Sequence, residues 1–182
     1  KNFTLYFITD GYTILPITSV CKSLIDEKGF LTRGVECFAP NFYITEAIYQ
    51  RLCVTANNII NNLERRNAPY VGILGLEGII CSNGKLYING IKTSFDDIDA
   101  CSVLNTCEDD LYKIFTSCVN GFFSDEYEEI KTNALNFASA LKTGETEDRE
   151  NVDFITPDSY VKTCFASTLR HAKEKLNDTS LF

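Results

Sequence analysis

The chain has 182 residues, of which 45% are hydrophobic and 23% charged, and its formal net charge is −8. This composition is typical of a globular domain, and a chain of this length can bury a sizeable core. The negative charge excludes nucleic acid and anionic membranes as main partners, because both bind basic surfaces. No run of about 18 apolar residues occurs, so we predict no membrane span.

The chain opens at Lys1 inside an apolar run and contains no methionine, so we expect it to be a piece of a longer polypeptide. Its eight cysteines include no CxxC pair and are scattered through apolar stretches. Such residues usually behave as small buried hydrophobes, so reduced thiols are expected, with disulfides as the alternative. The pattern predicts the cytoplasm or another reducing compartment.

Two strands are predicted at the start of the chain, over residues 3–9 and 12–20. The dipeptide Asp10-Gly11 between them is a hairpin turn signal. Residues 21–43 have no clean period and contain two glycines and one proline. We therefore predict a long loop there, and long ordered loops are often functional.

A long amphipathic helix is predicted next, with Thr45 as its N-cap. The sequence Asn67-Ala68-Pro69 ends it, because proline cannot continue a helix. A nearly continuous apolar stretch, residues 70–81, then suits a strand in the middle of a sheet. A further strand is predicted over residues 85–91.

The remainder of the chain is predicted to be mostly helical. Apolar residues recur with helical spacing over 109–120 and again over 125–141. The polar stretch 144–153 indicates a solvated loop or linker. A final helix is predicted over 158–176, with Pro157 near its first turn.

Few residues in the chain could carry chemistry. Glu77 is the one charge in its apolar strand, and is either a solvent-facing carboxylate or a buried functional one. The cluster Asp96, Asp97 and Asp99 could hold a cation through oxygens, or form an exposed turn with helix-capping value. The only histidine, His171, lies beside lysines, so we expect it to be solvated, which leaves a catalytic triad little to build on.

Four stretches carry a resemblance to a known family when they are taken in order. FTLYFITDG (3–11) looks like that family's Phe-Ser…Asp-Gly strand, and LPITS (15–19) looks like its Leu-Pro strand. TRGVECFAP (32–40) lies on Thr-Gly-Gly-Met-Gly-Ala-Tyr-Ser-Pro, and NGKLYINGIK (83–92) falls on Pro-Lys-Val-Ile-Glu-Phe-Asn-Cys-Arg. The chain thus resembles the ATP-grasp ligases of the glycinamide ribonucleotide synthetase (phosphoribosylamine–glycine ligase) family.

The resemblance implies an α+β fold with a mostly antiparallel sheet flanked by helices. It covers residues 1–123 as an ATP-grasp-like lobe and is faint beyond. Residues 124–182 would then be a mostly helical C-terminal extension, the remnant of the family's last domain.

The departures from the family pattern fall where its chemistry resides. The family's Glu and Asn hold Mg²⁺ on the ATP phosphates, and these positions are Ile88 and Gly90 here. The family's Gly-Gly-Met-Gly loop becomes Arg33-Gly34-Val35-Glu36, where a carboxylate would repel phosphate. Mg²⁺ requires oxygen ligands, and phosphoryl transfer depends on that metal. We therefore predict no metal ligands and no catalytic residues.

Three hypotheses follow from this resemblance. The leading one is a degenerate domain without cofactors, a structural or protein-interaction module whose partners are other protein chains or the rest of the parent protein. The second is a divergent ATP- and magnesium-dependent phosphoribosylamine–glycine ligase of purine biosynthesis, with Glu77 or Asp96 and Asp97 as replacement ligands. The third hypothesis is a binding module that binds nucleotide without metal, through Lys22 and Lys92. Residual nucleotide binding would use Lys22, Lys92 and Glu77.

Overall fold

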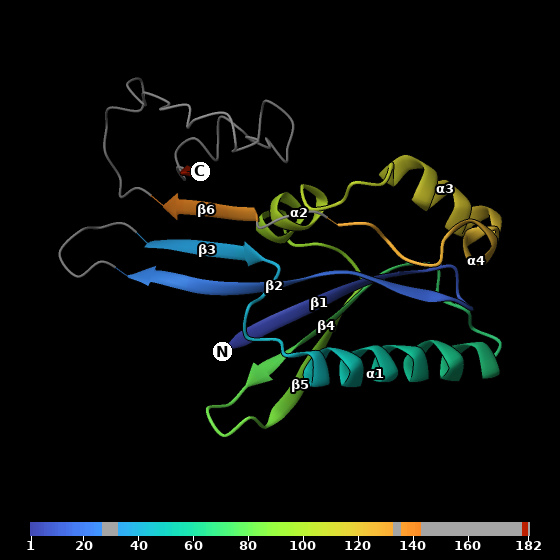
Figure 1. Ribbon diagram of the computed structural model, residues 1–182, viewed down its shortest axis with the longest axis horizontal. Coiled ribbons are helices and arrows are strands. Elements are labelled where there is room, and N and C mark those ends of the chain that lie inside the picture. Colours follow the sequence, from blue (N-terminus) through green and yellow to red (C-terminus); the bar gives the residue numbers. More distant parts are fainter. Residues whose placement is uncertain (27–32, 133–135, 143–179, 182) are drawn as a thin grey trace.

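The computed structural model describes residues 1–26, 33–132, 136–142 and 180–181 (Figure 1). The described strands form one seven-stranded sheet in the order β5-β4-β1-β2-β3-β6-β7, and every neighbouring pair is antiparallel. The strands are β1 (Asn2–Thr9), β2 (Ile14–Asp26), β3 (Arg33–Ala39), β4 (Gly72–Ile80), β5 (Leu86–Lys92), β6 (Asn136–Lys142) and β7 (Ser180–Leu181). The helices are α1 (Glu46–Arg65), α2 (Asp97–Leu104), α3 (Leu111–Asn120) and α4 (Phe123–Glu126).

Helices cover both faces of the sheet, with α1 on one side and α2, α3 and α4 on the other (Figure 1). Side chains alternate along β1 because successive strand residues point to opposite faces. Phe3, Leu5 and Phe7 pack with α1, whereas Tyr6 and Ile8 pack beneath the other helices. The central strand is therefore buried on both faces, and the predicted α+β class with a mostly antiparallel sheet flanked by helices is confirmed.

Local signals at the start of the chain act as predicted. Asp10 closes the first hairpin, where its Oδ1 accepts hydrogen bonds from the backbone N–H groups of Tyr12 (2.9 Å) and Thr13 (2.7 Å). Thr45 is the N-cap of α1, and its Oγ1 accepts from the N–H of Ile48 at 3.4 Å. The helix ends at Arg65, just before Asn67-Ala68-Pro69.

The next predicted elements are also confirmed. The strands expected over 70–81 and 85–91 are β4 and β5. The helix expected over 109–120 is α3, where Asp110 is the N-cap and accepts from the N–H groups of Tyr112 (3.0 Å) and Lys113 (3.4 Å).

The long loop predicted over 21–43 is wrong. β2 continues to Asp26, and β3 pairs with it from Cys21 opposite Phe38 to Asp26 opposite Arg33. β3 has backbone partners on both edges, in β2 and in β6. These long-range hydrogen bonds hold the strand without the alternating pattern by which a strand is recognised in a sequence.

The helix predicted over 125–141 is also wrong. α4 ends at Glu126, and residues 136–142 form β6, paired with β3 along its whole length. The helical spacing of apolar residues is a local preference, and tertiary strand pairing overrides it. The loop predicted over 144–153, the helix over 158–176 and His171 lie outside the described residues. The domain division after residue 123 stays a prediction.

Within the described ranges, no helix is both long and apolar enough to cross a membrane.

Leu52 provides a test of the α1 layer. Its side chain is fully buried, whereas Val54 on the same helix is 59% exposed. We expect Leu52→Ala to lower the free energy of unfolding by about 2–5 kcal/mol, because it leaves a cavity under the sheet. Val54→Ala should change it by no more than about 0.5 kcal/mol. Urea unfolding followed by circular dichroism measures both, and equal losses would contradict the observed orientation of α1.

Candidate functional site

A cluster of charged side chains lies between the sheet and the start of α2. Lys22 extends from β2, Glu77 from β4 and Lys92 from the end of β5. Asp96 is the N-cap of α2, and Asp99 lies in its first turn. The structure thus brings together Lys22, Glu77 and Lys92, the three residues that the sequence singled out for nucleotide binding. Lys92 Nζ lies 4.0 Å from Glu77 Oε2.

Asp96 bridges the two lysines with one oxygen. Its Oδ2 lies 2.5 Å from Lys22 Nζ and 2.6 Å from Lys92 Nζ. Asp96 is the N-cap of α2, as expected for a capping residue, yet its side chain makes no capping hydrogen bond. The carboxylate is engaged by the lysines instead.

Asp99 lies beneath this pair and is fully buried. Its Oδ1 is 2.8 Å from Lys22 Nζ, and its Oδ2 accepts a hydrogen bond of 2.5 Å from the Tyr6 hydroxyl. The Cys37 thiol donates to Oδ1 at 3.7 Å. The prediction of an exposed acidic turn is therefore wrong for Asp99, because the first turn of α2 directs this side chain onto the sheet. Asp96 and Asp97 are exposed.

The pKa shifts in this cluster follow from its contacts. Burial opposes the charge of Lys22, but hydrogen bonds and charges from Asp96 and Asp99 outweigh it and raise the Lys22 pKa. Hydrogen bonds from Lys22 and Lys92 lower the Asp96 pKa. Burial, with Asp99 adding to it, raises the Tyr6 pKa, and burial raises the Cys37 pKa to about 12. At neutral pH Lys22 is therefore charged, while the Tyr6 hydroxyl and the Cys37 thiol remain protonated.

Sequence reasoning missed Tyr6, Cys37 and the burial of Asp99. The spacing of three charged residues was the one available signal of an ion-pair cluster: Asp96 follows Lys92 by four residues, and Asp99 follows Asp96 by three. Tyr6 and Cys37 reach Asp99 only because of the register of their strands. The identities of these residues do not reveal that register.

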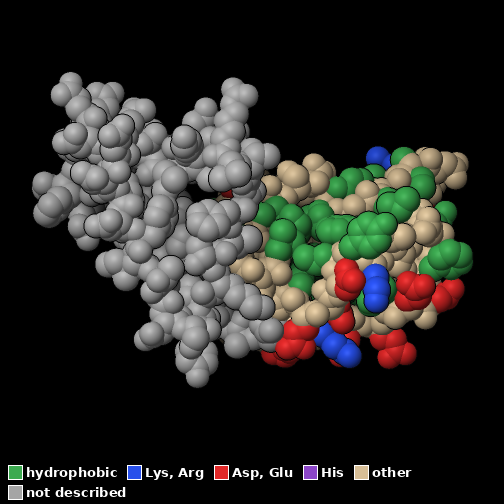
Figure 2. Space-filling model, turned by 90° about the horizontal axis from the view of Figure 1, so that it is seen from above, with side chains coloured by type: hydrophobic (Ala, Val, Ile, Leu, Met, Phe, Trp, Pro, Cys, Tyr) green, Lys and Arg blue, Asp and Glu red, His purple; other side chains and the backbone are tan. Residues whose placement is uncertain are grey.

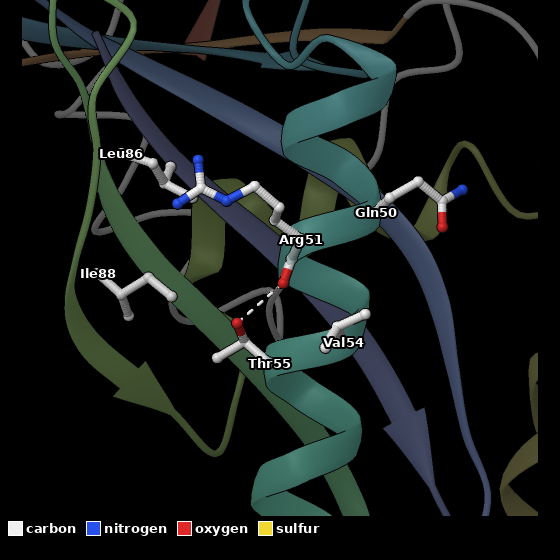
Figure 3. Close-up of a pocket in the computed structure, with 6 residues that line it drawn as sticks. All are labelled: Gln50, Arg51, Val54, Thr55, Leu86 and Ile88. Carbon is white, nitrogen blue, oxygen red and sulfur yellow. Dashed lines mark hydrogen bonds between the residues drawn. The ribbon is translucent and has the colours of Figure 1, made fainter.

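Ile88 lies on the other face of the sheet from this cluster. Its side chain, like that of Leu86, borders an open groove of about 500 Å³ between β5 and α1 (Figure 3). The α1 side of the groove is formed by Gln50, Arg51, Val54 and Thr55. Ile88 therefore presents an apolar side chain to α1 and supplies no lone pair.

Gly90 faces the cluster. It pairs with Glu77, whereas Ile88 pairs with Gly78, so Asn89 is an extra residue in a β-bulge. A Cβ added to Gly90 would lie 3.2 Å from Glu77 Oε2, which shows that the Glu77 side chain extends over the glycine. Positions 88 and 90 thus lie on opposite faces of β5, where their side chains cannot share one ion.

The residues present do not fit a magnesium–nucleotide site. Both lysines are paired with carboxylates, and Ile88 and Gly90 offer no oxygen side chains. In the part of the chain that the structure describes, no three His, Cys, Asp or Glu residues are grouped so as to hold a metal ion.

Comparison with known proteins identifies relatives in sequence and in fold, although no family model matches the chain. Over 98% of its length the chain is 24% identical to phosphoribosylamine–glycine ligase of Methanosphaera stadtmanae. It spans 38% of that relative and 32% of a second one, from Pyrococcus horikoshii.

Two solved structures share the fold. Phosphoribosylamine–glycine ligase from Thermotoga maritima matches with a TM-score of 0.59 and 12% identity, over 78% of this chain and 35% of that one. The biotin carboxylase domain of Hydrogenobacter thermophilus 2-oxoglutarate carboxylase, crystallised with MgADP, matches with a TM-score of 0.51 and 16% identity, over 78% and 29%.

The sheet, its two helical layers and these likenesses define an ATP-grasp-like domain. In sequence the chain is similar to phosphoribosylamine–glycine ligase, and it covers well under half of the length of those relatives.

Asp99 can be tested by removing its charge. Asp99→Asn removes a buried negative charge that offsets the positive charge of Lys22. We therefore expect the free energy of unfolding to fall by about 2–4 kcal/mol. Glu64→Gln is the control, because it removes an exposed carboxylate from α1 on the opposite face of the sheet, and should cost no more than about 0.5 kcal/mol. Chemical denaturation of both variants would contradict this account if the two losses were equal.

The lysine–carboxylate cluster also predicts a pH dependence of stability. The lowered Asp96 pKa means that its contribution is present above the ordinary value of 3.8 and is lost as pH falls below it. The raised Lys22 pKa means that its contribution is present below the ordinary value of 10.5 and is lost as pH rises further. Urea unfolding from pH 2.5 to pH 7 should show a shallower acid decline in Asp96→Asn than in wild type. An equal acid decline in the two proteins would contradict this account.

Proposed function

We propose that the chain is a degenerate ATP-grasp ligase-like domain without a cofactor, which acts as a structural or protein-interaction module in a larger protein or assembly. The observation that carries the proposal is the ion-pair cluster. Asp96 binds the two lysines that would otherwise attract a phosphate, and Asp99 and Glu77 add further negative charge. Two ammonium groups face three carboxylates, so an incoming polyphosphate would meet net repulsion.

The opposite orientations of Ile88 and Gly90 support the same proposal. Phosphoryl transfer relies on a metal ion to neutralise charge that develops on the phosphate. Such an ion would need oxygens converging from one face of β5, and here one position is apolar and faces α1. The fold is retained while the groups that would serve the reaction are not.

Partners and location follow from the proposed role. A module of this kind would bind other protein chains or the remainder of its parent protein. None of the seven cysteines within the described residues forms a disulfide. This supports a reducing compartment such as the cytoplasm, where thiols persist.

Titration calorimetry with ATP tests the proposal. We expect no magnesium-dependent binding in the micromolar range, because Asp96 already occupies both lysines. Asp96→Asn should allow weak, magnesium-independent ATP binding, since it frees Lys22 and Lys92 from one carboxylate. Micromolar, magnesium-dependent binding to the wild-type chain would overturn the proposal.

A magnesium-independent interaction in the wild-type chain would instead favour a nucleotide-binding module. That binding should disappear in Lys92→Ala, with Lys85→Ala, which lies outside the cluster, as its control.

A divergent phosphoribosylamine–glycine ligase is the second candidate. It is favoured by the sequence similarity over 98% of the chain, and by Glu77, whose side chain is 44% exposed beside Lys92 and could replace a lost ligand. The test is phosphate release by the full-length parent protein supplied with phosphoribosylamine, glycine, ATP and magnesium. Turnover that is lost in Glu77→Gln would support this candidate, and the absence of phosphate release would reject it.

A further inference from the structure

A groove runs over the outer side of α3 and α4, away from the ion-pair cluster. Its volume is about 480 Å³ and it is open to solvent. Tyr112, Lys113 and Thr116 form its α3 side, and Phe122, Glu126 and Tyr127 form the other. Figure 2 shows hydrophobic side chains gathered on one face of the molecule, with acidic and basic side chains beside them.

Large apolar side chains are exposed around this groove. Tyr112 is 79% exposed, Phe122 is 55% exposed and Val119 is 76% exposed. Tyr112 and Val119 are seven residues apart, so they lie on the same face of α3. Single exposed apolar residues are ordinary, but a contiguous group beside a groove is typical of an interaction surface.

The Ser117 hydroxyl is an independent sign that the groove receives a ligand. Ser117 lines the groove, is only 4% exposed, and its Oγ has no hydrogen-bond partner among the described residues. A buried hydroxyl without a partner costs free energy, which a donor or acceptor on a docked chain would recover.

Glu126 and Lys113 line the groove, and the charge of the segment that carries it indicates the chemistry of the partner. Seven carboxylates occur between Glu108 and Glu129, against one lysine, Lys113. Asp110 caps α3 and Asp109 accepts a hydrogen bond from the Lys131 N–H. The other five, all exposed, are Glu108, Asp125, Glu126, Glu128 and Glu129.

We propose that this groove docks a basic, amphipathic helical segment of a partner protein. Apolar side chains of the segment would cover Tyr112 and Phe122, while its lysines and arginines would face the carboxylates and the aromatic rings. A second copy of this acidic chain fits less well, because its own groove region would repel the first. The inference rests on the proposed interaction module and assigns it a surface and a class of partner.

Fluorescence anisotropy with two labelled peptides tests the inference on the 182-residue chain. One probe is an amphipathic helical peptide of leucine and lysine, and the other replaces every lysine by glutamate. We expect the basic probe to bind at least about tenfold more tightly than the acidic one. The preference should decrease with added salt, since the carboxylates are exposed.

Substitutions locate the binding surface. Tyr112→Ala with Phe122→Ala should weaken binding of the basic probe by at least about tenfold, because exposed aromatic anchors dominate such contacts. Val54→Ala, which trims a 59% exposed side chain on α1, should leave binding unchanged. Ser117→Ala should weaken binding a few-fold without lowering the thermal midpoint, as expected when a hydroxyl has no partner within the free protein.

Three results would overturn the inference: equal binding of both probes, unchanged binding in the aromatic double variant, or self-association of the chain through this groove with no probe bound. Its failure is distinguishable from that of the proposed function. If the chain showed no preference for the basic peptide and no ATP binding, the proposed module role would stand and the partner would bind another surface. Magnesium-dependent ATP binding would reject the module role itself.

Discussion

A carboxylate that is buried in a protein must be compensated by its neighbours, and Asp99 meets this constraint through three adjacent strands. Tyr6 on β1, Lys22 on β2 and Cys37 on β3 all contact its two oxygens. Groups on three strands thereby hold the first turn of α2 at one position on the sheet. The charge is costly to bury without these partners, so the docking of α2 and the register of the strands depend on each other.

This arrangement also decides what the lysines can do. In an anion-binding site a lysine remains available to the incoming ligand, and its charge raises the local concentration of anions. Here Lys22 and Lys92 share one oxygen of Asp96, a carboxylate supplied by the chain itself. The two lysines thereby connect β2 and β5 to the start of α2.

The sequence predicted the elements that depend on neighbouring residues. Asp10 at the hairpin, Thr45 at the start of α1 and Asp110 at the start of α3 act through contacts a few residues away, and all three elements form as expected. β3 and β6 were missed because each is held by a strand far along the chain. Within the candidate site, the sequence predicted Lys22, Glu77 and Lys92, but it did not predict that Asp96 and Asp99 would pair with the two lysines. This pairing depends on the orientation of α2 over the sheet, which no local pattern encodes.

The bulge at Asn89 has a consequence for how such a domain could evolve. In a regular strand, residues 88 and 90 would share a face, and two point substitutions could rebuild a pair of ligands there. With one extra residue in the strand the two positions are out of phase, so restoring the side chains alone would leave them on opposite faces. Placing them on one face would also require a change of strand register within β5. Substitution of side chains alone therefore cannot place two ligands side by side on one face of this strand, because the strand register sets the direction of each side chain.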